Sequence, residues 1–264
     1  MGIVNVTPDS FSDGGRYQNE TAAIEHSLRL AAEGADILDI GGESTRPYAT
    51  PLSADEELRR ILPVVTALCQ QVSIPVSIDT SKAAVARAAI AAGAEIINDV
   101  TGLTGDPEMI PLAVETSAAV CAMHMRGTPQ TMQDNPSYRD VVGEILEYLR
   151  QRREALLAAG IDRERICLDP GIGFGKTHEH NIALMANCWR FHELGCPILV
   201  GHSRKGFISK LIRIMTADLG EPDLAAGTIG GACALARQGI QIIRVHDVAP
   251  VRQALQLFAA CGGQ

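Results

Sequence analysis

Residues 21–42 read TAAIEHSLRLAAEGADILDIGG, and this stretch contains the unit that recurs along the chain. Its first part is Ala-rich and amphipathic, with the periodicity of a helix, and it stops at Gly34. A short apolar run at 36–40 follows and ends in Gly41-Gly42, as is typical of a buried strand that leads into a turn. The stretch therefore predicts a helix over 21–33 and a strand over 36–40.

The same pairing of strand and helix recurs eight times, with no break in composition and no linker. Apolar strands that alternate with helices indicate parallel strands covered on both faces. Eight such units in a chain of this length predict an α/β fold, a single (β/α)8 TIM barrel that forms one domain over 1–264. An open doubly wound sheet is the alternative, which the number of units disfavours. The other strands are expected at 2–6, 75–78, 95–97, 118–123, 165–168, 197–200 and 241–245, and the other helices at 53–71, 81–92, after Asp106-Pro107, 138–159, 179–194, 205–215, 224–237 and 249–260.

Composition narrows the possible partners. The chain has 264 residues, is 46% hydrophobic, and carries a net charge of −8 with a pI of about 5.4. This balance disfavours nucleic acid and anionic membranes as partners, so an anionic substrate would need a local cluster of positive charge. No apolar run approaches the length of a membrane span, and no leader-like segment opens the chain. The sequence therefore predicts a cytoplasmic protein that acts on small molecules.

The cysteines point to the same compartment. Their number is odd, they form no C-x-x-C pair, and several lie in apolar runs. This pattern predicts unbonded thiols in a reducing compartment, and it disfavours a disulfide framework or a zinc site. The cysteines are Cys69, Cys121, Cys167, Cys188, Cys196, Cys233 and Cys261.

A long polar loop follows the first expected strand. Residues 5–15 read NVTPDSFSDGG, which combines turn-forming residues with one aromatic residue, Phe11. A loop of this length and composition at the end of a strand is more often a lid or binding loop than a simple connector. We expect residues 7–16 to close over a ligand.

Polar side chains stand at nearly every expected strand end. The carboxyl ends of barrel strands meet at one rim, which is where barrel enzymes have their active sites. Because the barrel does not need these polar groups in order to fold, the set predicts a site. Its members are Asn5, Asp39, Asp79, Asn98, His124, Asp169, His202, Ser203, Arg244 and His246.

Two nucleotide-binding motifs are nearly matched and can be rejected. The run 171–177, GIGFGKT, resembles a P-loop, but Pro170 stands where that motif needs its first glycine. The dinucleotide pattern also fails, because Lys176 occupies the third glycine position. The glycines are instead expected to let a flat ligand approach the rim.

Six stretches of the sequence resemble, in order, the motifs of the dihydropteroate synthase family. The resemblance covers essentially the whole chain, and its first two stretches together are close to diagnostic. It implies that 6-hydroxymethyl-7,8-dihydropterin diphosphate condenses with 4-aminobenzoate to give 7,8-dihydropteroate and diphosphate, with Mg2+ as cofactor. The stretches are 5–15, 39–47 (DIGGESTRP), 98–100 (NDV), 169–176 (DPGIGFGK), 203–205 (SRK) and 244–246 (RVH).

The resemblance implies a pterin site formed by Asp79, Asn98, Asp169 and Lys205. The amino group and ring N–H of a pterin are donors, for which an ionised carboxylate is the matching acceptor, and Asp169 is the best candidate. Lys205 can donate to the carbonyl on the other side of the ring. We expect Lys205 to stay protonated beside the carboxylates.

The diphosphate site is implied at Asn5, Thr45, Arg46, Arg244 and His246. Arginine suits phosphate oxygens because its planar fork can donate two hydrogen bonds at once. Asn5 also offers a carbonyl oxygen to Mg2+, which prefers oxygen ligands. Together with the four pterin residues, Arg244 and His246 are the expected catalytic residues of an SN1-like substitution at the pterin methylene.

The resemblance implies an aminobenzoate site at Phe11, Thr45, Pro47, Phe174 and Ser203. Sulfonamides copy aminobenzoate and are expected to compete there. Loops 7–16 and 42–50 are expected to close and to exclude water. The family is commonly homodimeric through barrel helices, so a homodimer is also implied.

Several positions depart from the family pattern or have no implied role. Gly206 stands where many members carry a further serine that touches the aminobenzoate carboxylate. The given sequence opens at the first expected strand, where the family usually has a further segment, so either its start is trimmed or the bottom of the barrel is expected to be less well plugged. His124 is expected to be structural and Asp39 to brace its own loop. Lys176 is expected to be a solvated or loop-anchoring charge.

Three other functions remain as alternatives. A pterin-binding methyltransferase domain that uses methyltetrahydrofolate would not need Arg244, His246 and the Arg46 loop. A barrel that only sequesters pterin would not need Asn5 as a metal ligand. A Schiff-base aldolase would need Lys205 with a depressed pKa in an apolar pocket, which the neighbouring acids disfavour.

Overall fold

A computed structural model describes residues 1–7, 16–215 and 221–263 of the chain. Six parallel strands pair in sequence order: β1 (Gly2–Asn5), β2 (Leu38–Gly41), β3 (Val76–Asp79), β4 (Ile96–Asp99), β5 (Ala119–Met123) and β6 (Ile166–Asp169). Two shorter parallel strands, β7 (Leu199–Val200) and β8 (Ile242–Ile243), pair with each other.

The two sets of strands join into one closed ring. A bridge between Leu168 and Ile198 connects β6 to the start of β7, and a bridge between Gly2 and Val245 connects β8 back to β1. The N–H of Ile3 donates to the carbonyl of Val245 at 2.9 Å, and the N–H of Val245 donates to that of Met1 at 3.0 Å. The expected eight-stranded α/β barrel is thereby confirmed.

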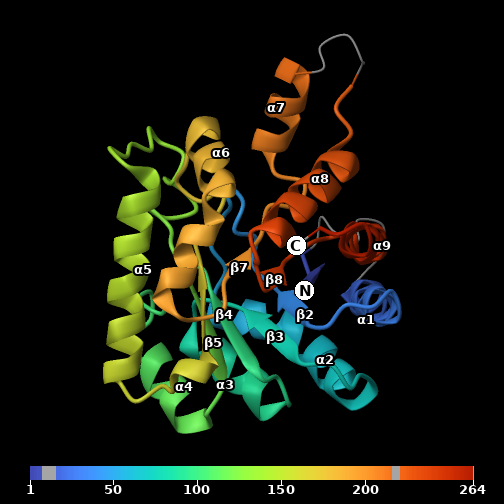
Figure 1. Ribbon diagram of the computed structural model, residues 1–264. Coiled ribbons are helices and arrows are strands. Elements are labelled where there is room, and N and C mark those ends of the chain that lie inside the picture. Colours follow the sequence, from blue (N-terminus) through green and yellow to red (C-terminus); the bar gives the residue numbers. More distant parts are fainter. Residues whose placement is uncertain (8–15, 216–220, 264) are drawn as a thin grey trace.

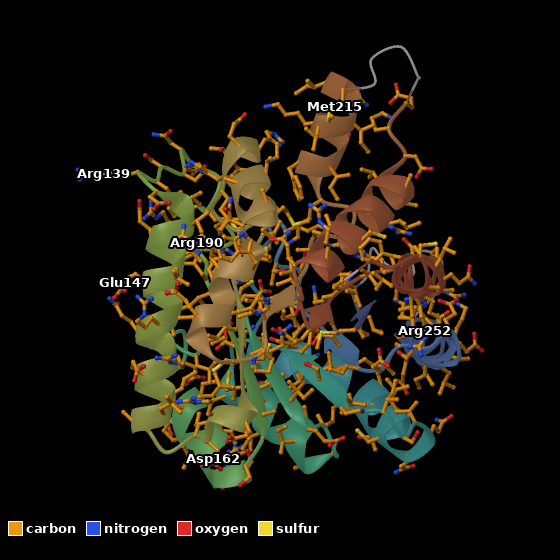
Figure 2. The ribbon with its side chains drawn as sticks, viewed as in Figure 1. Arg139, Glu147, Asp162, Arg190, Met215 and Arg252 are labelled. Atoms are coloured by element: carbon orange, nitrogen blue, oxygen red, sulfur yellow. The ribbon has the colours of Figure 1, made fainter. Side chains whose placement is uncertain are left out.

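Helices surround the strands (Figure 1). They are α1 (Arg16–Ala32), α2 (Ala54–Gln71), α3 (Ala83–Ala91), α4 (Met109–Thr116), α5 (Val141–Ala158), α6 (His178–Ala186), α7 (Gly206–Met215), α8 (Leu224–Arg237) and α9 (Val248–Ala260), with short 3-10 helices η2 (Arg163–Arg165) and η3 (Cys188–Leu194). Strand residues such as Val4, Leu38 and Ile97 are fully buried because neighbouring strands and helices cover them. Figure 2 shows charged residues such as Glu147 directed outward from α5.

Local sequence accounts for several helix ends. The side chain of Ser53 accepts a hydrogen bond from the N–H of Glu56 at 3.2 Å, as expected for the cap of α2. Gly34 and Gly160 have positive φ angles just beyond α1 and α5, where helices commonly stop at a glycine.

Some expected boundaries were wrong. The first helix begins at Arg16 and not at Thr21, and α5 begins at Val141 after the capping residue Asp140. The expected helix over 179–194 is divided, because α6 ends before Asn187 and the chain continues as η3. The side chain of Asn187 donates to the carbonyl of Ala183 at 2.9 Å, in competition with regular helical bonding.

Asp106 does not cap α4 as expected. The helix begins at Met109, and the Asp106 carboxylate accepts from the N–H of Ala83 at 2.8 Å and from that of Glu108 at 3.0 Å. The side chain therefore caps α3, a helix that precedes it by more than twenty residues. Tertiary contact has overridden the local signal.

Among the described residues, no helix is long and apolar enough to cross a membrane. All seven cysteines lie in this part of the chain and are unbonded, as expected. Met215, at the outer end of α7, is 73% exposed and lies far from the strands in Figure 2.

Candidate active site

A cavity of about 1340 Å³ opens at the carboxyl ends of the strands. Its lining residues come from several separate segments, from β1 to the turn after β8. Most of the expected site residues line it: Asn5, Thr45, Arg46, Pro47, Asp79, Phe174, Ser203, Lys205, Arg244 and His246. Asn98 and Asp169 are not among the described lining residues, and Phe11 lies outside the described part of the chain.

Arg244 is held by two carboxylates at the floor of this cavity. Its Nε donates to Asp39 at 2.6 Å and its Nη2 donates to Asp79 at 2.7 Å. The same Asp39 oxygen accepts from the side-chain amide of Asn98 at 3.0 Å. Asp39 therefore connects Asn98 to Arg244, and it does more than brace its own loop. These two hydrogen bonds do not use the Nη1 group of Arg244.

Burial and charge oppose each other in this cluster. Burial raises the pKa of Asp79 to about 7, although Arg244 opposes the rise. Burial alone would lower the pKa of Arg244, but Asp39 and Asp79 more than offset this effect and hold it above its ordinary value. Arg244 is thus charged, and Asp79 is poised between its two protonation states near neutral pH.

Asp169, at the end of β6, is close enough to Lys205 for the two charges to affect each other. Its carboxylate accepts from the N–H of Gly171 at 2.7 Å. Burial raises the pKa of Asp169, while this hydrogen bond and the charges of Lys205, Lys176 and Arg244 oppose the rise. Those interactions place Asp169, Lys205 and Arg244 at the same end of the barrel.

The ammonium group of Lys205 is partly enclosed. It donates to the carbonyl of Ile172 and lies 4.6 Å from the centre of the Phe174 ring. Burial lowers its pKa to about 8, against the opposing effect of Asp169. The pKa of Lys205 is therefore depressed although acids lie nearby, but a pKa of about 8 still leaves the amine mainly protonated at neutral pH, as expected.

His246 and Ser203 form a pair. Nδ1 of His246 lies 3.0 Å from the Ser203 hydroxyl, which also accepts from the backbone N–H of His246 at 3.3 Å. Burial lowers the pKa of His246 to about 4, assisted by Arg204 and Arg244. The imidazole is therefore neutral near pH 7, and when Nδ1 accepts from Ser203 the Nε2–H can donate to an anion. Ser203 is buried and lines the cavity beside this histidine.

The loop that bears Thr45, Arg46 and Pro47 is anchored at its base. Lys82 donates to Glu43 at 2.7 Å and to Glu57 of α2 at 2.6 Å, and Glu57 is fully buried. The Arg46 and Pro47 side chains are exposed. The loop therefore presents its cation from a fixed base.

One contributing segment was not singled out from the sequence. The long connection between β5 and α5 supplies Met132, Gln133 and Pro136 to the cavity, and Gln133 donates to the carbonyl of Gly173 at 2.8 Å. Its length was the available signal, since a loop of this size inside a compact domain is usually functional.

The glycine-rich run after β6 is a tight chain reversal. Gly171 and Gly175 have φ angles of 68° and 67°. A side chain at either would meet the carbonyl oxygen of His124 or of Arg126. The expectation that glycine admits a flat ligand was therefore wrong here, because the backbone of the protein itself occupies the space.

Lys176 is buried, at 2% exposure, so the expectation of a solvated charge was wrong. Its ammonium nitrogen lies 3.0 Å from Nδ1 of His124 and 2.9 Å from the carbonyl oxygen of Phe174. The alternative expectation, a loop-anchoring charge, agrees with these contacts. His124 is buried and packs edge-on against Tyr148, in agreement with a structural role.

A metal ion would need partners beyond the protein. Among the described residues, no group of three or more His, Cys, Asp or Glu side chains is arranged to hold one. Asn5 ends β1 and lines the cavity, and its amide oxygen is the hard donor that Mg2+ accepts. This donor fits an ion that takes its other ligands from phosphate and water.

Comparison with known proteins gives one consistent result. Residues 1–246 match the family described as pterin binding enzyme. The chain is 44% identical to dihydropteroate synthase of Escherichia coli strain K12 over 260 residues, which covers 98% of this chain and 90% of that protein.

Solved structures agree over the full length. A Xanthomonas albilineans dihydropteroate synthase with 4-aminobenzoic acid superposes with a TM-score of 0.91 at 46% identity, covering 100% of this chain and 93% of that one. A Yersinia pestis dihydropteroate synthase in a sulfonamide drug complex gives 0.90 at 42% identity, covering 100% and 94%.

Proposed function

The chain belongs to the dihydropteroate synthase family of pterin-binding enzymes, and on that premise we propose how its residues join 6-hydroxymethyl-7,8-dihydropterin diphosphate to 4-aminobenzoate. The C–O bond to diphosphate breaks, a C–N bond to the aniline nitrogen forms, and that nitrogen loses a proton. The whole chain acts as one pterin-binding barrel domain.

Asp79, Asn98, Asp169 and Lys205 hold the pterin. An ionised carboxylate is a strong acceptor for the amino group and ring N–H of the pterin. Burial raises the pKa of Asp169, and the Gly171 N–H, Lys205, Lys176 and Arg244 oppose this rise and so favour the ionised form. Lys205 donates to the pterin carbonyl. Binding would require its ammonium group to exchange the carbonyl of Ile172 for the ligand.

The diphosphate is bound by Arg244, His246, Arg46, Thr45 and Asn5. The Nη1 group of Arg244 is the donor that its two carboxylate bonds leave available, and Nε2–H of His246 is a second. When Mg2+ is bound, it neutralises charge that develops on the leaving diphosphate. Because fixed donors face this charge, departure of diphosphate precedes attack, in an SN1-like substitution.

Aminobenzoate is assigned to Phe174, Pro47 and Thr45, which line the cavity. Phe11, assigned with them from the sequence, lies outside the described residues. Ser203 is assigned to this subsite from the sequence, but its bond to His246 favours a role in orienting that histidine. A sulfonamide would compete for the same place, as the complex of the Yersinia pestis relative suggests.

One observation carries the proposal: Asp79, Lys205 and Arg244 line the same cavity, and Lys205 faces the charges of Asp169, Arg244 and Asp79. The subsite proposed for the pterin therefore adjoins the positively charged subsite proposed for the diphosphate. The alternative, a methyltransferase domain that uses methyltetrahydrofolate, gives no reason for a charged arginine at this floor.

A coupled assay of diphosphate release tests the function. With pterin diphosphate and Mg2+, release is expected to depend on 4-aminobenzoate and to fall when Mg2+ is chelated. Arg244→Ala is expected to weaken binding of product diphosphate strongly, measured by calorimetry. Release without formation of dihydropteroate would refute the assignment.

We also propose that the protein is a cytoplasmic homodimer. The exposed apolar residues Ile214 and Met215 of α7, at 69% and 73%, support pairing through barrel helices. Sedimentation equilibrium is expected to give twice the chain mass, and a monomer at all concentrations would contradict pairing.

A further inference from the structure

Lys176 is a buried amine to which the proposed reaction assigns no role. It comes from the reversal after β6, and burial first, then Lys205 and Arg126, lower its pKa while Asp169 raises it. Among the described residues its hydrogen bonds reach no carboxylate: the three acceptors are Nδ1 of His124 and the carbonyl oxygens of His124 and Phe174. Burial of an amine at such sites is costly unless its donors are satisfied, so this arrangement must be held by the fold around it.

The partners of Lys176 are well fixed. His124 directly follows β5, is 6% exposed, and its ring meets Tyr148 edge-on with 4.8 Å between ring centres. Burial, followed by the charge of Lys176, lowers the pKa of His124 to about 2, so the imidazole is neutral and its Nδ1 can accept. Lys176 therefore connects the reversal to a rigid point on the neighbouring strand.

Two substrate-facing groups depend on the segment that Lys176 holds. The side-chain nitrogen of Lys176 donates to the carbonyl oxygen of Phe174 at 2.9 Å. The Phe174 ring lies 4.6 Å from the side-chain nitrogen of Lys205. Lys205 in turn donates to Ile172, within the same reversal. A shift of residues 171–175 would displace both the aromatic wall and the lysine that faces the pterin.

We propose that Lys176 is a positioning residue for the pterin and aminobenzoate subsites, which it orients by tying the 171–175 reversal to His124. The inference rests on the proposed function, because it uses the subsites assigned to Lys205 and Phe174. It predicts selectivity: Arg244 and His246 reach the cavity from β8 and the turn after it, so the diphosphate subsite does not share this tie.

The test compares three ligands on Lys176→Met. We expect the dissociation constant for 6-hydroxymethylpterin and the Michaelis constant for aminobenzoate to rise by up to roughly tenfold, as for the loss of one hydrogen bond. The dissociation constant for diphosphate should stay within about twofold. Lys176→Gln can still donate to Phe174 and is expected to recover part of the loss. Lys210→Met is the matched control, since Lys210 is half exposed and its nearest carboxylate oxygen, on Glu179, is 3.9 Å away.

A lower Tm with all three ligand constants unchanged, or with all three weakened alike, would overturn the inference. If Lys176→Met does not fold, the same three ligand constants are measured on Lys176→Gln and His124→Gln. Weaker binding of pterin and aminobenzoate with unchanged binding of diphosphate would support the inference. Absence of turnover in the unmodified protein would instead refute the proposed function, so the two failures are distinguishable.

Discussion

Replacing Arg244 by methionine should destabilise the protein in a way that depends on pH. Methionine keeps most of the aliphatic stem but removes the guanidinium that joins Asp39, fully buried, to Asp79, 13% exposed. Breaking a buried ion pair by removing one partner costs about 3–5 kcal/mol, because the other charge is left uncompensated. We expect a loss of that size at about pH 8.

The pH dependence follows from Asp79. Its pKa in the folded protein is about 7, above the ordinary 3.8, so the folded state binds more protons than the unfolded state between those values, and stability falls as pH rises through this window. Without Arg244, which lowers this pKa, the window extends to higher pH. The difference between variant and parent should therefore grow above about pH 7, by up to roughly 1.4 kcal/mol per pH unit.

Urea unfolding at about pH 6, 7 and 8, followed by circular dichroism, measures these differences. Arg87→Met is the matched control, since it removes an exposed pair with Glu115 and should change little. A loss at pH 8 below about 1 kcal/mol, or one independent of pH, would refute the assigned dependence of the two carboxylates on Arg244.

Three further outcomes are expected. Gly171→Ala should lower the Tm much more than Gly160→Ala, because both positions have positive φ but only the first would overlap another residue, and equal shifts would contradict the steric explanation. Pterin affinity should fall as pH rises through about 8, because Lys205 loses its proton. The fall should be absent when Lys205→Met is titrated with the same ligand. A fall in affinity that persists in this variant would mean that another group causes it. Ser53→Ala should cost about 1 kcal/mol in urea unfolding by removing the α2 cap, with Ser53→Gly costing only a few tenths, and equal losses would argue against capping.

The barrel was predictable because its signals are local and repeated. Each strand is an apolar run between a helix stop and a turn, so periodicity and glycine positions were enough to locate all eight. Boundaries failed where a distant partner decides them. Asp106 reads as the cap of the helix that follows it, yet it binds Ala83 of an earlier helix, and nothing within the local sequence encodes that contact.

The candidate site was predictable as a set of strand-end residues, but the hydrogen bonds and ion pairs among those residues were not. Arg244 meets Asp39 only because β8 closes onto β1, a contact between residues 205 positions apart. Lys176 stands beside glycines in the sequence, which predicts a solvated side chain, but in the structure it is buried and contacts His124, the residue after β5. Residue type indicated which groups could do chemistry, whereas the tertiary structure determined their charge states.

Closure of the ring between Val245 and the first strand has a consequence for synthesis on the ribosome. Of the residues assigned to the substrates, only His246 leaves the exit tunnel after Arg244. The strand β1 gains its contacts with the β8 segment only once that segment has emerged. A nascent chain therefore exposes an unpaired edge of β1 while most of its helices are already made. Ligand binding, which needs Arg244, comes too late to assist that stage, so chaperones that shield strand edges should matter more to this protein's yield than its substrates do.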